Sequence, residues 1–485
     1  MPEPLPLDLV TLESLAARFG TPLQIYDEEL IRTNCRSLLS SFGSRFPGFR
    51  QYFAVKALPN PAILRVLVDE GCGLDCSSVA ELHIAEELGV TGSDVMYTSN
   101  YTSLADLTIA SRMGVIINLD DASLLPTVIE ANGGKPPALI SFRLNPGLGR
   151  TDSETLSNVL GGPNAKFGVP PDQIVAAYTA ARKAGVKRFG LHMMTGSCVL
   201  SDAYWLEAVN VLLDAAARVQ AEAGVTEFEF INIGGGLGIP YREGAPRVDL
   251  EPLSAALASA FDARWAASGL KGTPPKLYME NGRFMTGPYG WLISRCEAVK
   301  EAFGSRYYGL DSSMANLMRP GMYGSYHAIT VPAREVVGGP RALANVVGTL
   351  CENNDWFAKD RDLPSNAQRG DLFVIHDTGA HSHSMGFQYN GKLRAPEILL
   401  RSPSSSSGGI RRAELIRRRE TLDYLYGNTV MPYDLAKGIP RSYLYGQKQK
   451  WLWLSTATLL ASGILIGAAI SIVIIKNKIV GRGAN

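Results

Sequence analysis

The sequence predicts an α/β protein with a (β/α)8 TIM barrel, a C-terminal mostly-β domain and, after it, a single transmembrane helix. Three observations lead to this prediction. Short apolar runs alternate with helical patterns before residue 285, the alternation stops after it, and one long apolar segment lies near the C-terminus. A chain of 485 residues also exceeds one ordinary domain, so two domains with an appendage are expected.

Eight short apolar runs are the predicted barrel strands, and six stretches between them have the three- and four-residue apolar spacing of amphipathic helices. The predicted strands are Gln51–Val55, Gly73–Cys76, Val95–Tyr97, Val115–Leu119, Ala138–Arg143, Arg188–His192, Glu227–Ile233 and Lys276–Met279. The predicted helices are Pro61–Glu70, Ser78–Leu88, Ser103–Arg112, Gln173–Ala184, Ala203–Ala221 and Leu250–Ala267. Strands that alternate with helices indicate parallel β-α units, and eight such units indicate a closed barrel. A doubly wound open sheet is the structural alternative.

Downstream of the barrel pattern, strand-like runs are separated by Gly, Pro and Asp clusters without long helical patterns. These runs are Gly290–Ser294, Ala342–Leu350 and Asp371–His376. They predict a mostly β domain, interrupted by the low-complexity loop 401–409. The predicted domain order is an N-terminal segment joining the β domain (1–30), a barrel (31–285), the β domain (286–426), a linker (427–450) and an anchor (451–476).

The anchor is predicted from Leu452–Ile475, which contains 24 residues without a charge. As a helix this segment would be about 36 Å long, enough to cross a hydrocarbon core of about 30 Å. Trp451 and Trp453 lie at one end, where amphipathic rings favour the headgroup region. A buried core helix is the alternative. The sequence therefore predicts a membrane-anchored protein whose catalytic domain faces the cytoplasm.

Composition excludes several other classes of function. The net charge is +1, which gives no reason to expect a nucleic-acid partner. The six cysteines show no C-x-x-C pairing and the N-terminus shows no basic, apolar leader, so free thiols in a reducing compartment are expected. The six histidines lack metal-ligand spacing, and we predict no metal site.

Polar residues at the carboxyl ends of the predicted strands suggest the chemistry, because barrel active sites gather at that face. Lys56 closes the first run, and a desolvated lysine can bond covalently to an aldehyde, although most lysines are simply solvated. Gly234-Gly-Gly236 closes the seventh run, where backbone amides can approach a phosphate, and Glu280 closes the eighth. An amine, a glycine-rich anion site and a carboxylate together fit pyridoxal phosphate.

Several blocks, in order, resemble the diaminopimelate decarboxylases: YFAVKALPNPAILRVL, GLDCSSVAEL, INIGGGLGIPY, MENGRFMTGPYG, DSSMANLMRPGMYGSYH, CENNDW, GDLFVIHDTGAHSHSMGFQYNGKLR and LIRRRETLD. These enzymes belong to a wider group with the ornithine and arginine decarboxylases, which combine an alanine-racemase-like barrel with a β domain. The resemblance extends from about Pro6 to about Tyr426 and does not include the predicted anchor. It implies decarboxylation of meso-diaminopimelate to L-lysine and CO2, with pyridoxal 5'-phosphate as cofactor and a homodimer with shared active sites.

The resemblance also implies roles for individual residues. Lys56 would hold the cofactor, Glu280 would face its pyridine nitrogen, and Cys351 of the second subunit would donate a proton. The implied cofactor-binding residues are Lys56, Asp75, His192, Ser197, Gly235, Gly236, Glu280, Asn281, Gly282, Arg283 and His381. The implied substrate-binding residues are Arg283, Arg319, Tyr323, Glu352 and Tyr389. Diaminopimelate ends in an ammonium and a carboxylate, which suit the charges of Glu352 and Arg319.

Three positions depart from the family pattern. Met194 stands at the second histidine of the H-x-H-x-G-S block, and a thioether cannot titrate as an imidazole does. Asn281 replaces a proline, and His381 replaces the tyrosine of the G-A-Y block. The departures leave two alternatives open: a decarboxylase of another diamino acid of either configuration (ornithine, lysine or arginine type), or a weakly active, membrane-tethered homologue with a binding or regulatory role. A racemase on the same barrel is disfavoured by Glu280.

Overall fold

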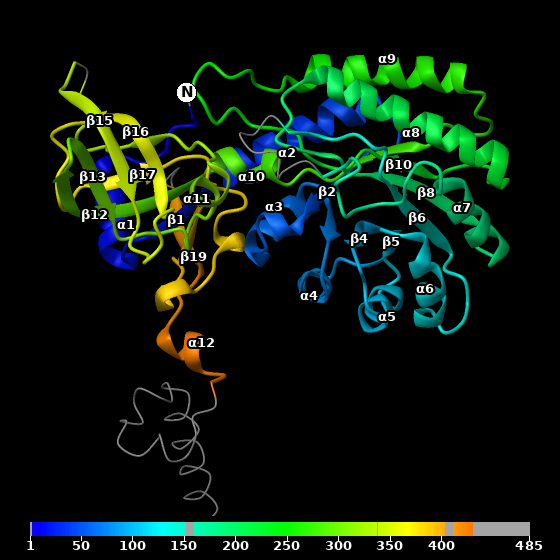
Figure 1. The fold of residues 1–485 in the computed structure, drawn as a ribbon, viewed down its shortest axis with the longest axis horizontal. Coiled ribbons are helices and arrows are strands. Elements are labelled where there is room, and N and C mark those ends of the chain that lie inside the picture. The colour runs from blue at the N-terminus through cyan, green and yellow to red at the C-terminus, as the bar shows by residue number, and fades with distance from the viewer. Residues whose placement is uncertain (1, 152–159, 337, 403–410, 430–485) are drawn as a thin grey trace, which may run out of the picture. The chain divides into compact units, whose positions relative to one another are not determined.

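The computed structural model describes residues 2–151, 160–336, 338–402 and 411–429. The chain divides into a first unit that ends at Arg418 and a second that begins at Arg419. The described part of the second unit contains the short helix α12 (Leu422–Tyr426). The barrel and the β domain both belong to the first unit (Figure 1).

Eight parallel strands close into a barrel, so the prediction of a (β/α)8 barrel is confirmed and the open-sheet alternative is wrong. The barrel strands are β2 (Arg50–Ala54), β3 (Gly73–Cys76), β4 (Val95–Ser99), β5 (Ile116–Leu119), β6 (Leu139–Leu144), β8 (Arg188–Met193), β10 (Phe230–Asn232) and β11 (Lys276–Met279). Closure is made by β11, which pairs in parallel with both β10 and β2. The carboxyl ends of all eight strands therefore meet at one face of the barrel.

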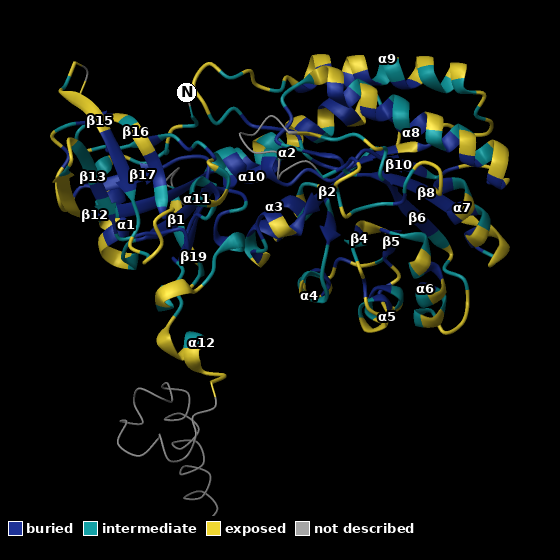
Figure 2. Ribbon diagram, viewed as in Figure 1, coloured by how far each residue is buried: buried dark blue, intermediate teal, exposed yellow. Residues whose placement is uncertain are grey.

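Helices surround this barrel and bury one face each against it, as the dark blue inner faces in Figure 2 show. They are α2 (Glu28–Gly43), α3 (Pro61–Asp69), α4 (Val79–Glu87), α5 (Leu104–Arg112), α6 (Leu125–Ala131), α7 (Ile174–Lys183), α8 (Asp202–Ala223) and α9 (Leu250–Ser268). Local sequence sets where several of them begin. At α4, the Ser78 side chain accepts from the Glu81 amide while the Glu81 carboxylate accepts from the Ser77 amide, which satisfies two otherwise unpaired donors.

The β domain is a nine-stranded sheet with the strand path β16-β15-β13-β12-β1-β18-β19, from which β17 pairs with β12 and β14. Its strands are β1 (Leu23–Asp27), β12 (Gly290–Ala302), β13 (Ser305–Leu310), β14 (Ile329–Thr330), β15 (Arg341–Val347), β16 (Trp356–Pro364), β17 (Leu372–Ile375), β18 (Glu397–Arg401) and β19 (Arg412–Arg417). The N-terminal strand β1 lies between β12 and β18, antiparallel to the first and parallel to the second. The N-terminus of the chain thus joins a sheet built mostly from its C-terminal third.

Short elements complete the first unit. They are the helices α1 (Leu9–Phe19), α10 (Arg283–Thr286) and α11 (Arg319–Tyr323), the 3-10 turn η1 (Val55–Ala57), and the paired strands β7 (Arg150–Thr151) and β9 (Gly196–Ser197). Helices α1, α2 and α6 were not among the predicted helices. Helix α2 begins inside the predicted N-terminal segment 1–30 and continues into the predicted barrel.

A buried polar network fixes the β domain to the barrel beside the first barrel strand. The Glu397 carboxylate accepts hydrogen bonds from the Tyr26 hydroxyl (2.6 Å) and the Asn60 side chain (2.9 Å), and it pairs with Arg417. Asn60 in turn caps α3, because its side chain accepts from the Ala62 amide. This network holds the segment that follows Lys56 in one position relative to the β domain.

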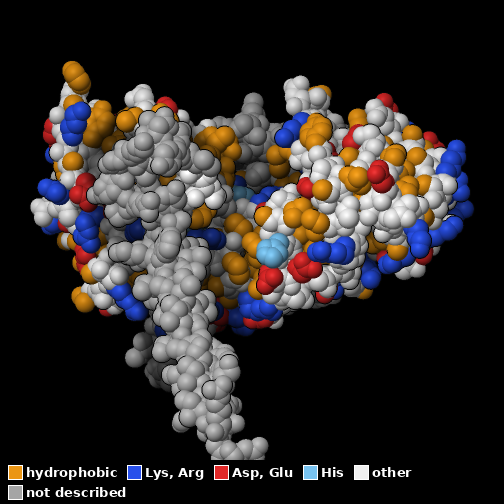
Figure 3. Space-filling view, turned by 90° about the horizontal axis from the view of Figure 1, so that it is seen from below, with side chains coloured by type: hydrophobic (Ala, Val, Ile, Leu, Met, Phe, Trp, Pro, Cys, Tyr) orange, Lys and Arg blue, Asp and Glu red, His pale blue; other side chains and the backbone are white. Residues whose placement is uncertain are grey.

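The predicted membrane location is corrected by the structure. No helix in the described ranges is long and apolar enough to cross a membrane. The predicted linker (427–450) lies almost entirely outside the described residues, and the predicted anchor (451–476) does so completely. On this finding we withdraw the prediction of a membrane-anchored protein. On the face seen in Figure 3, Lys, Arg, Asp and Glu side chains are interspersed with apolar ones over the barrel.

Candidate active site

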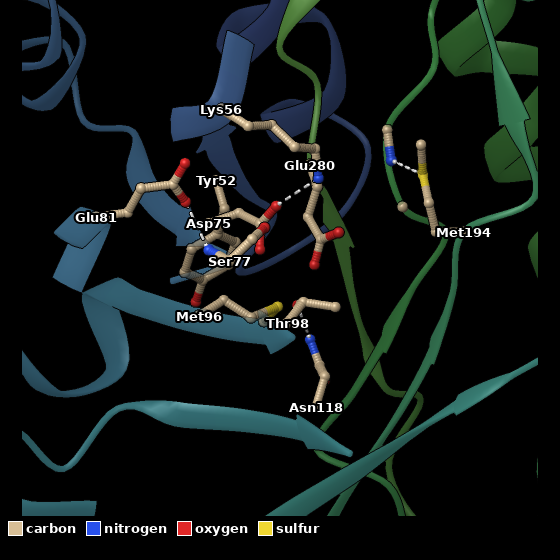
Figure 4. A network of polar contacts seen from close by, with 12 residues as sticks. Tyr52, Lys56, Asp75, Ser77, Glu81, Met96, Thr98, Asn118, Met194 and Glu280 are labelled. Carbon is tan, nitrogen blue, oxygen red and sulfur yellow. Dashed lines mark hydrogen bonds and ion pairs between the residues drawn. The ribbon is translucent and has the colours of Figure 1, made fainter. Parts of the chain in front are cut away.

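Lys56 and Asp75 lie together at the carboxyl ends of the first two barrel strands. Lys56 is in η1, directly after β2, and its Nζ lies 3.7 Å from Oδ2 of Asp75, which is in β3 (Figure 4). Asp75 is fully buried, and neither of its oxygens accepts a hydrogen bond from the described residues. Burial and the charge of Glu280 raise the pKa of the Asp75 carboxyl well above its ordinary value, while Lys56 opposes the shift. The half-exposed Lys56 amine thus lies beside a carboxyl that accepts no hydrogen bond from any other described group.

Glu280, which follows β11, is held by two neighbouring strands. Its Oε2 lies 3.0 Å from Nε2 of His192, and its Oε1 accepts a 2.7 Å hydrogen bond from the side chain of Asn232. Burial alone would raise the pKa of this carboxyl, but the His192 ring, Lys56 and the Asn232 hydrogen bond hold it below the ordinary value. Nδ1 of His192 has no hydrogen-bond partner among the described residues. Glu280 therefore stays ionised, and its carboxylate can accept a hydrogen bond from a further donor.

The loop after β10 requires glycine at each of its three positions. Gly234 and Gly236 have φ of 73° and 112°, a region that other residues rarely adopt. A Cβ on Gly235 would lie 2.1 Å from the carbonyl oxygen of Glu280, and one on Gly236 would lie 2.4 Å from that of Gly196. Side chains are excluded here, so the backbone lies close to its neighbours. Gly234 and Gly235 are buried, and Gly236 is partly exposed.

Met194 contacts this loop directly. Its Sδ accepts a hydrogen bond from the Gly235 amide (3.2 Å), and its backbone carbonyl accepts one from the Arg143 guanidinium (3.0 Å). Arg143 is also paired with Asp120 at 3.4 Å. The thioether therefore occupies a defined place against the glycine loop, across from Glu280 in Figure 4.

Asn281 and Gly282 serve the packing between strands. The Asn281 side chain donates to Oε1 of Gln51 (3.1 Å) and accepts from the Leu237 amide (3.2 Å), so it ties the glycine loop to β2. A Cβ on Gly282 would lie 2.7 Å from the Cβ of Ala57, next to Lys56. Asn281 thus has both ends of its side chain engaged within the protein.

Two buried arginines meet at one hydroxyl. Arg283 and Arg319 donate to the Tyr241 hydroxyl at 2.6 and 2.7 Å, and among the described residues neither has a carboxylate within ion-pair distance. Burial, together with the like charge of Arg283, lowers the pKa of Arg319 to about 10. Arg319 also donates to Nε2 of the fully buried His327 (2.9 Å), whose Nδ1 donates to the carbonyl of His376. Two buried cations without an anion form a site for a carboxylate or phosphate.

His381 lies in the same region on a loop of the β domain. Its backbone amide donates to the carbonyl of Ala57 (2.9 Å), directly after Lys56, and its φ is 54°. Burial and the positive charges of Arg283, Arg319 and Lys56 lower the pKa of its ring well below the ordinary value. The imidazole is therefore neutral, unlike the protonated form that an isolated histidine adopts in mild acid.

The remaining predicted residues divide into two groups. Ser197 in β9 and Tyr323 in α11 are partly buried. Cys351, Glu352 and Tyr389 are exposed, and no hydrogen bond or ion pair within the described chain joins them to the residues around Lys56. The Cys351 amide instead donates a hydrogen bond to Oδ1 of Asn390 (2.7 Å), in the turn that contains Tyr389.

Tyr241, Asn232 and Arg143 belong to this site but were not predicted. Tyr241 and Asn232 both lie within the glycine-loop block INIGGGLGIPY, so that motif contained the signal. Arg143 closes a predicted strand, and its position at the carboxyl end of β6 was the available clue.

The residues present fit pyridoxal phosphate. The Lys56 amine lies beside the buried Asp75 carboxyl, and the ionised Glu280 can accept a hydrogen bond from a ring N–H. The glycine loop supplies backbone amides for an anion, and the two buried arginines supply positive charge. When bound, the cofactor supplies an electron sink for the bond that breaks. Fold and site together define a pyridoxal-phosphate-dependent enzyme of the barrel and β-domain type.

Comparisons with known proteins identify the family. The pyridoxal-binding domain of the pyridoxal-dependent decarboxylases matches residues 30–287. Protein TabA of Pseudomonas amygdali pv. tabaci is 43% identical over 412 residues, which cover 85% of this chain and 92% of that protein. The diaminopimelate decarboxylase of Methanothermobacter thermautotrophicus is 36% identical over 424 residues, covering 87% and 95%. The chain belongs to the pyridoxal-dependent decarboxylases and is an amino-acid decarboxylase.

Solved structures agree with this assignment. The diaminopimelate decarboxylase of M. jannaschii in complex with L-lysine superposes with a TM-score of 0.77 at 28% identity, covering 87% of this chain and 95% of that one. The Helicobacter pylori enzyme, also complexed with L-lysine, gives a TM-score of 0.75 at 25% identity, covering 86% and 98%.

Proposed function

We propose that the protein decarboxylates meso-diaminopimelate to L-lysine and CO2. The observation that carries this proposal is the pair of buried arginines, Arg283 and Arg319, which share the Tyr241 hydroxyl and lack an anionic partner among the described residues. A substrate with a second carboxylate far from the reacting carbon would supply that anion. The similarity to diaminopimelate decarboxylases supports the same substrate.

Around the reacting carbon, three residues have separate tasks in this proposal. Lys56 would hold the cofactor through its aldehyde and would be released when the substrate amine takes its place. Glu280 would keep the pyridine nitrogen protonated, and its ionised state and its contacts with His192 and Asn232 support this role. Asp75 stays close to Nζ of Lys56 and orients it.

The cofactor phosphate is proposed to lie against the loop after β10. The loop amides would donate hydrogen bonds to its oxygens. The family resemblance implies that Gly282, Ser197 and His381 also bind the cofactor. The Gly235 amide already donates to Sδ of Met194, so the Gly236 amide is the better placed donor of the two.

Cys351 and Glu352 are proposed to act in the active site of a second copy of the chain. Both are exposed in the single chain, as is Tyr389, and among the described residues no hydrogen bond or ion pair joins them to the residues around Lys56. In a homodimer, Sγ of Cys351 would return the proton to the carbon that loses CO2, and Glu352 would bind the distal ammonium of the substrate.

The first experiment measures CO2 and lysine from the purified full-length protein, loaded with pyridoxal phosphate, with meso-diaminopimelate. Ornithine, lysine and arginine of both configurations serve as competing substrates. We expect release from meso-diaminopimelate to exceed that from the others. A cofactor-loaded protein that releases CO2 only from another diamino acid would refute the proposed substrate.

A second experiment tests the shared site. Lys56→Ala and Cys351→Ala chains, each inactive alone, are mixed after mild dissociation and reassociation. Random pairing gives heterodimers with one intact site, so activity should recover to about a quarter of that of the unmodified protein. No recovery, with heterodimers verified by differential tags, would show that Cys351 does not act across subunits.

A further inference from the structure

A cavity of about 570 Å³ is lined by residues other than those discussed above as part of the site, although Pro240 and Phe284 in its lining adjoin Tyr241 and Arg283 in the sequence. Its walls come from α2, the segment that continues the glycine loop, the start of α9, the residue after Arg283, and the β domain. Representative lining residues are Ser37, Ile239, Asp249, Phe284 and Asp377. The cavity is thus lined by elements of both the barrel and the β domain within the first unit, and it is open to solvent on one side, where Ser37 and Asp249 are exposed.

Asp377 is the unusual group in this lining. It is only 4% exposed, and its Oδ2 has no hydrogen-bond partner among the described residues. Burial raises the pKa of its carboxyl to about 7, although the positive charges of Arg247, which also lines the cavity, of Arg319 and of the chain's own N-terminal ammonium oppose the shift. A buried carboxyl oxygen without a donor is costly, and a donor in the cavity would remove that cost.

The rest of the lining offers acceptors and apolar surface. Of the other carboxylates in the lining, Glu251 is engaged by the Ser41 hydroxyl and Arg45, and Asp249 caps α9. Glu3, whose charge also raises the pKa of Asp377, faces the same cavity. Phe284, Ile239, Leu250 and Tyr289 add apolar area. A ligand that matches this lining carries a cationic N–H donor on a short hydrocarbon body.

We propose that this cavity binds an aliphatic ammonium ion, whose N–H donates to Oδ2 of Asp377 while its hydrocarbon part packs on Phe284 and Ile239. The position has a structural consequence for the catalytic face. Asp377 is four residues before His381, whose amide donates to the carbonyl of Ala57 beside Lys56. The ligand would therefore bind to the same β-domain loop that hydrogen-bonds to the residue after Lys56.

The proposal can be tested by calorimetric titration of the full-length, cofactor-loaded protein with N,N-dimethylbutylammonium chloride. This tertiary amine retains one N–H donor when protonated, and it cannot condense with the cofactor aldehyde. We expect saturable binding to one site per chain. Asp377→Asn should weaken it about tenfold or more, because an ionic hydrogen bond becomes a neutral one. Asparagine also tolerates the φ of 57° at this position, so the loop should keep its conformation.

Two matched variants control for indirect effects. Glu280→Gln makes the same carboxylate-to-amide change in the catalytic site and should leave binding of the ammonium probe unchanged. Ser37→Trp, on the exposed face of α2 at the cavity wall, should weaken binding by filling the volume, and it serves if Asp377→Asn does not fold. No saturable binding, equal affinity of Asp377→Asn and the unmodified protein, or loss of binding in Glu280→Gln alone would each overturn the proposal. None of these outcomes depends on which amino acid is decarboxylated.

Discussion

Glu280→Gln changes one atom of the most constrained carboxylate in the site. In the unmodified protein both oxygens have a partner, Oε2 with Nε2 of His192 and Oε1 with the Asn232 side chain. Glutamine has one oxygen and one amide nitrogen. If its nitrogen faces Asn232, two donors meet. If it faces His192, the ring must change tautomer to accept, and the amide oxygen is left for Asn232.

The first orientation leaves buried donors unsatisfied, which costs about 1–3 kcal/mol. Both orientations also remove the negative charge that would hold a protonated pyridine nitrogen. We therefore expect the affinity for pyridoxal phosphate to fall by about 5- to 150-fold, the equivalent of the same free energy. The rate of CO2 release at saturating cofactor should fall further, because a neutral amide does not keep the ring nitrogen protonated.

The assay is fluorescence-monitored cofactor binding to the cofactor-free protein, followed by CO2 release at saturating cofactor. Urea unfolding across pH gives an independent check. The pKa of Glu280 is lowered in the folded protein, so its stabilising contribution is present above the ordinary glutamate pKa and is lost as pH falls through the lowered value. The stability difference between the two proteins should shrink in acid. Unchanged cofactor affinity together with unchanged CO2 release would refute this reasoning about Glu280.

Four other substitutions give separable outcomes. Lys56→Ala should abolish the cofactor adduct that borohydride reduction fixes to the chain, and intact-mass spectrometry would reveal an adduct that persists. Gly235→Ala places a Cβ 2.1 Å from the Glu280 carbonyl oxygen and should cost about 1–3 kcal/mol of folding stability in urea unfolding. Tyr241→Phe removes the hydroxyl that both site arginines share and should lower kcat/KM by about 5- to 150-fold, and an unchanged kcat/KM would argue against a role in substrate binding. Met194→Leu keeps the volume but removes the sulfur acceptor, so stability should fall by less than about 1.5 kcal/mol, and a larger loss would indicate that the thioether does more than accept from the glycine loop.

The barrel was predictable because its information is local. Each strand is a short apolar run and each helix has an amphipathic repeat, and both patterns can be read within a dozen residues. Helices α1 and α2 also carry local signals, since Asp8 and Asp27 cap them by accepting from the Thr11 and Leu30 amides. A cap alone does not predict a helix, however, and the N-terminal segment lacks the alternation of strands and helices that marks the barrel.

The site was predictable in part for the same reason. Lys56, the glycine loop and Glu280 each end a strand, and parallel strands of a barrel bring their carboxyl ends together. Tyr241 ends the glycine-loop block, but the block does not reveal its role, because the two guanidinium groups that bind its hydroxyl come from residues 42 and 78 positions further along the chain. The sequence shows only that Asn281 replaces the proline of the family motif. The structure shows why an amide is useful there, because its side chain donates to Gln51 and accepts from the Leu237 amide.

The sequence by itself determined the (β/α)8 barrel, the pyridoxal-phosphate chemistry and the decarboxylase family, because strand and helix periodicity and the ordered motifs are properties of neighbouring residues. It also identified Met194 as a departure. Only the tertiary structure decided what Met194 touches, that Cys351 and Glu352 are exposed in the single chain, and that Oδ2 of the buried Asp377 has no donor among the described residues. These are matters of distance and desolvation between residues far apart in the chain, and both arise only when the barrel and the β domain pack together.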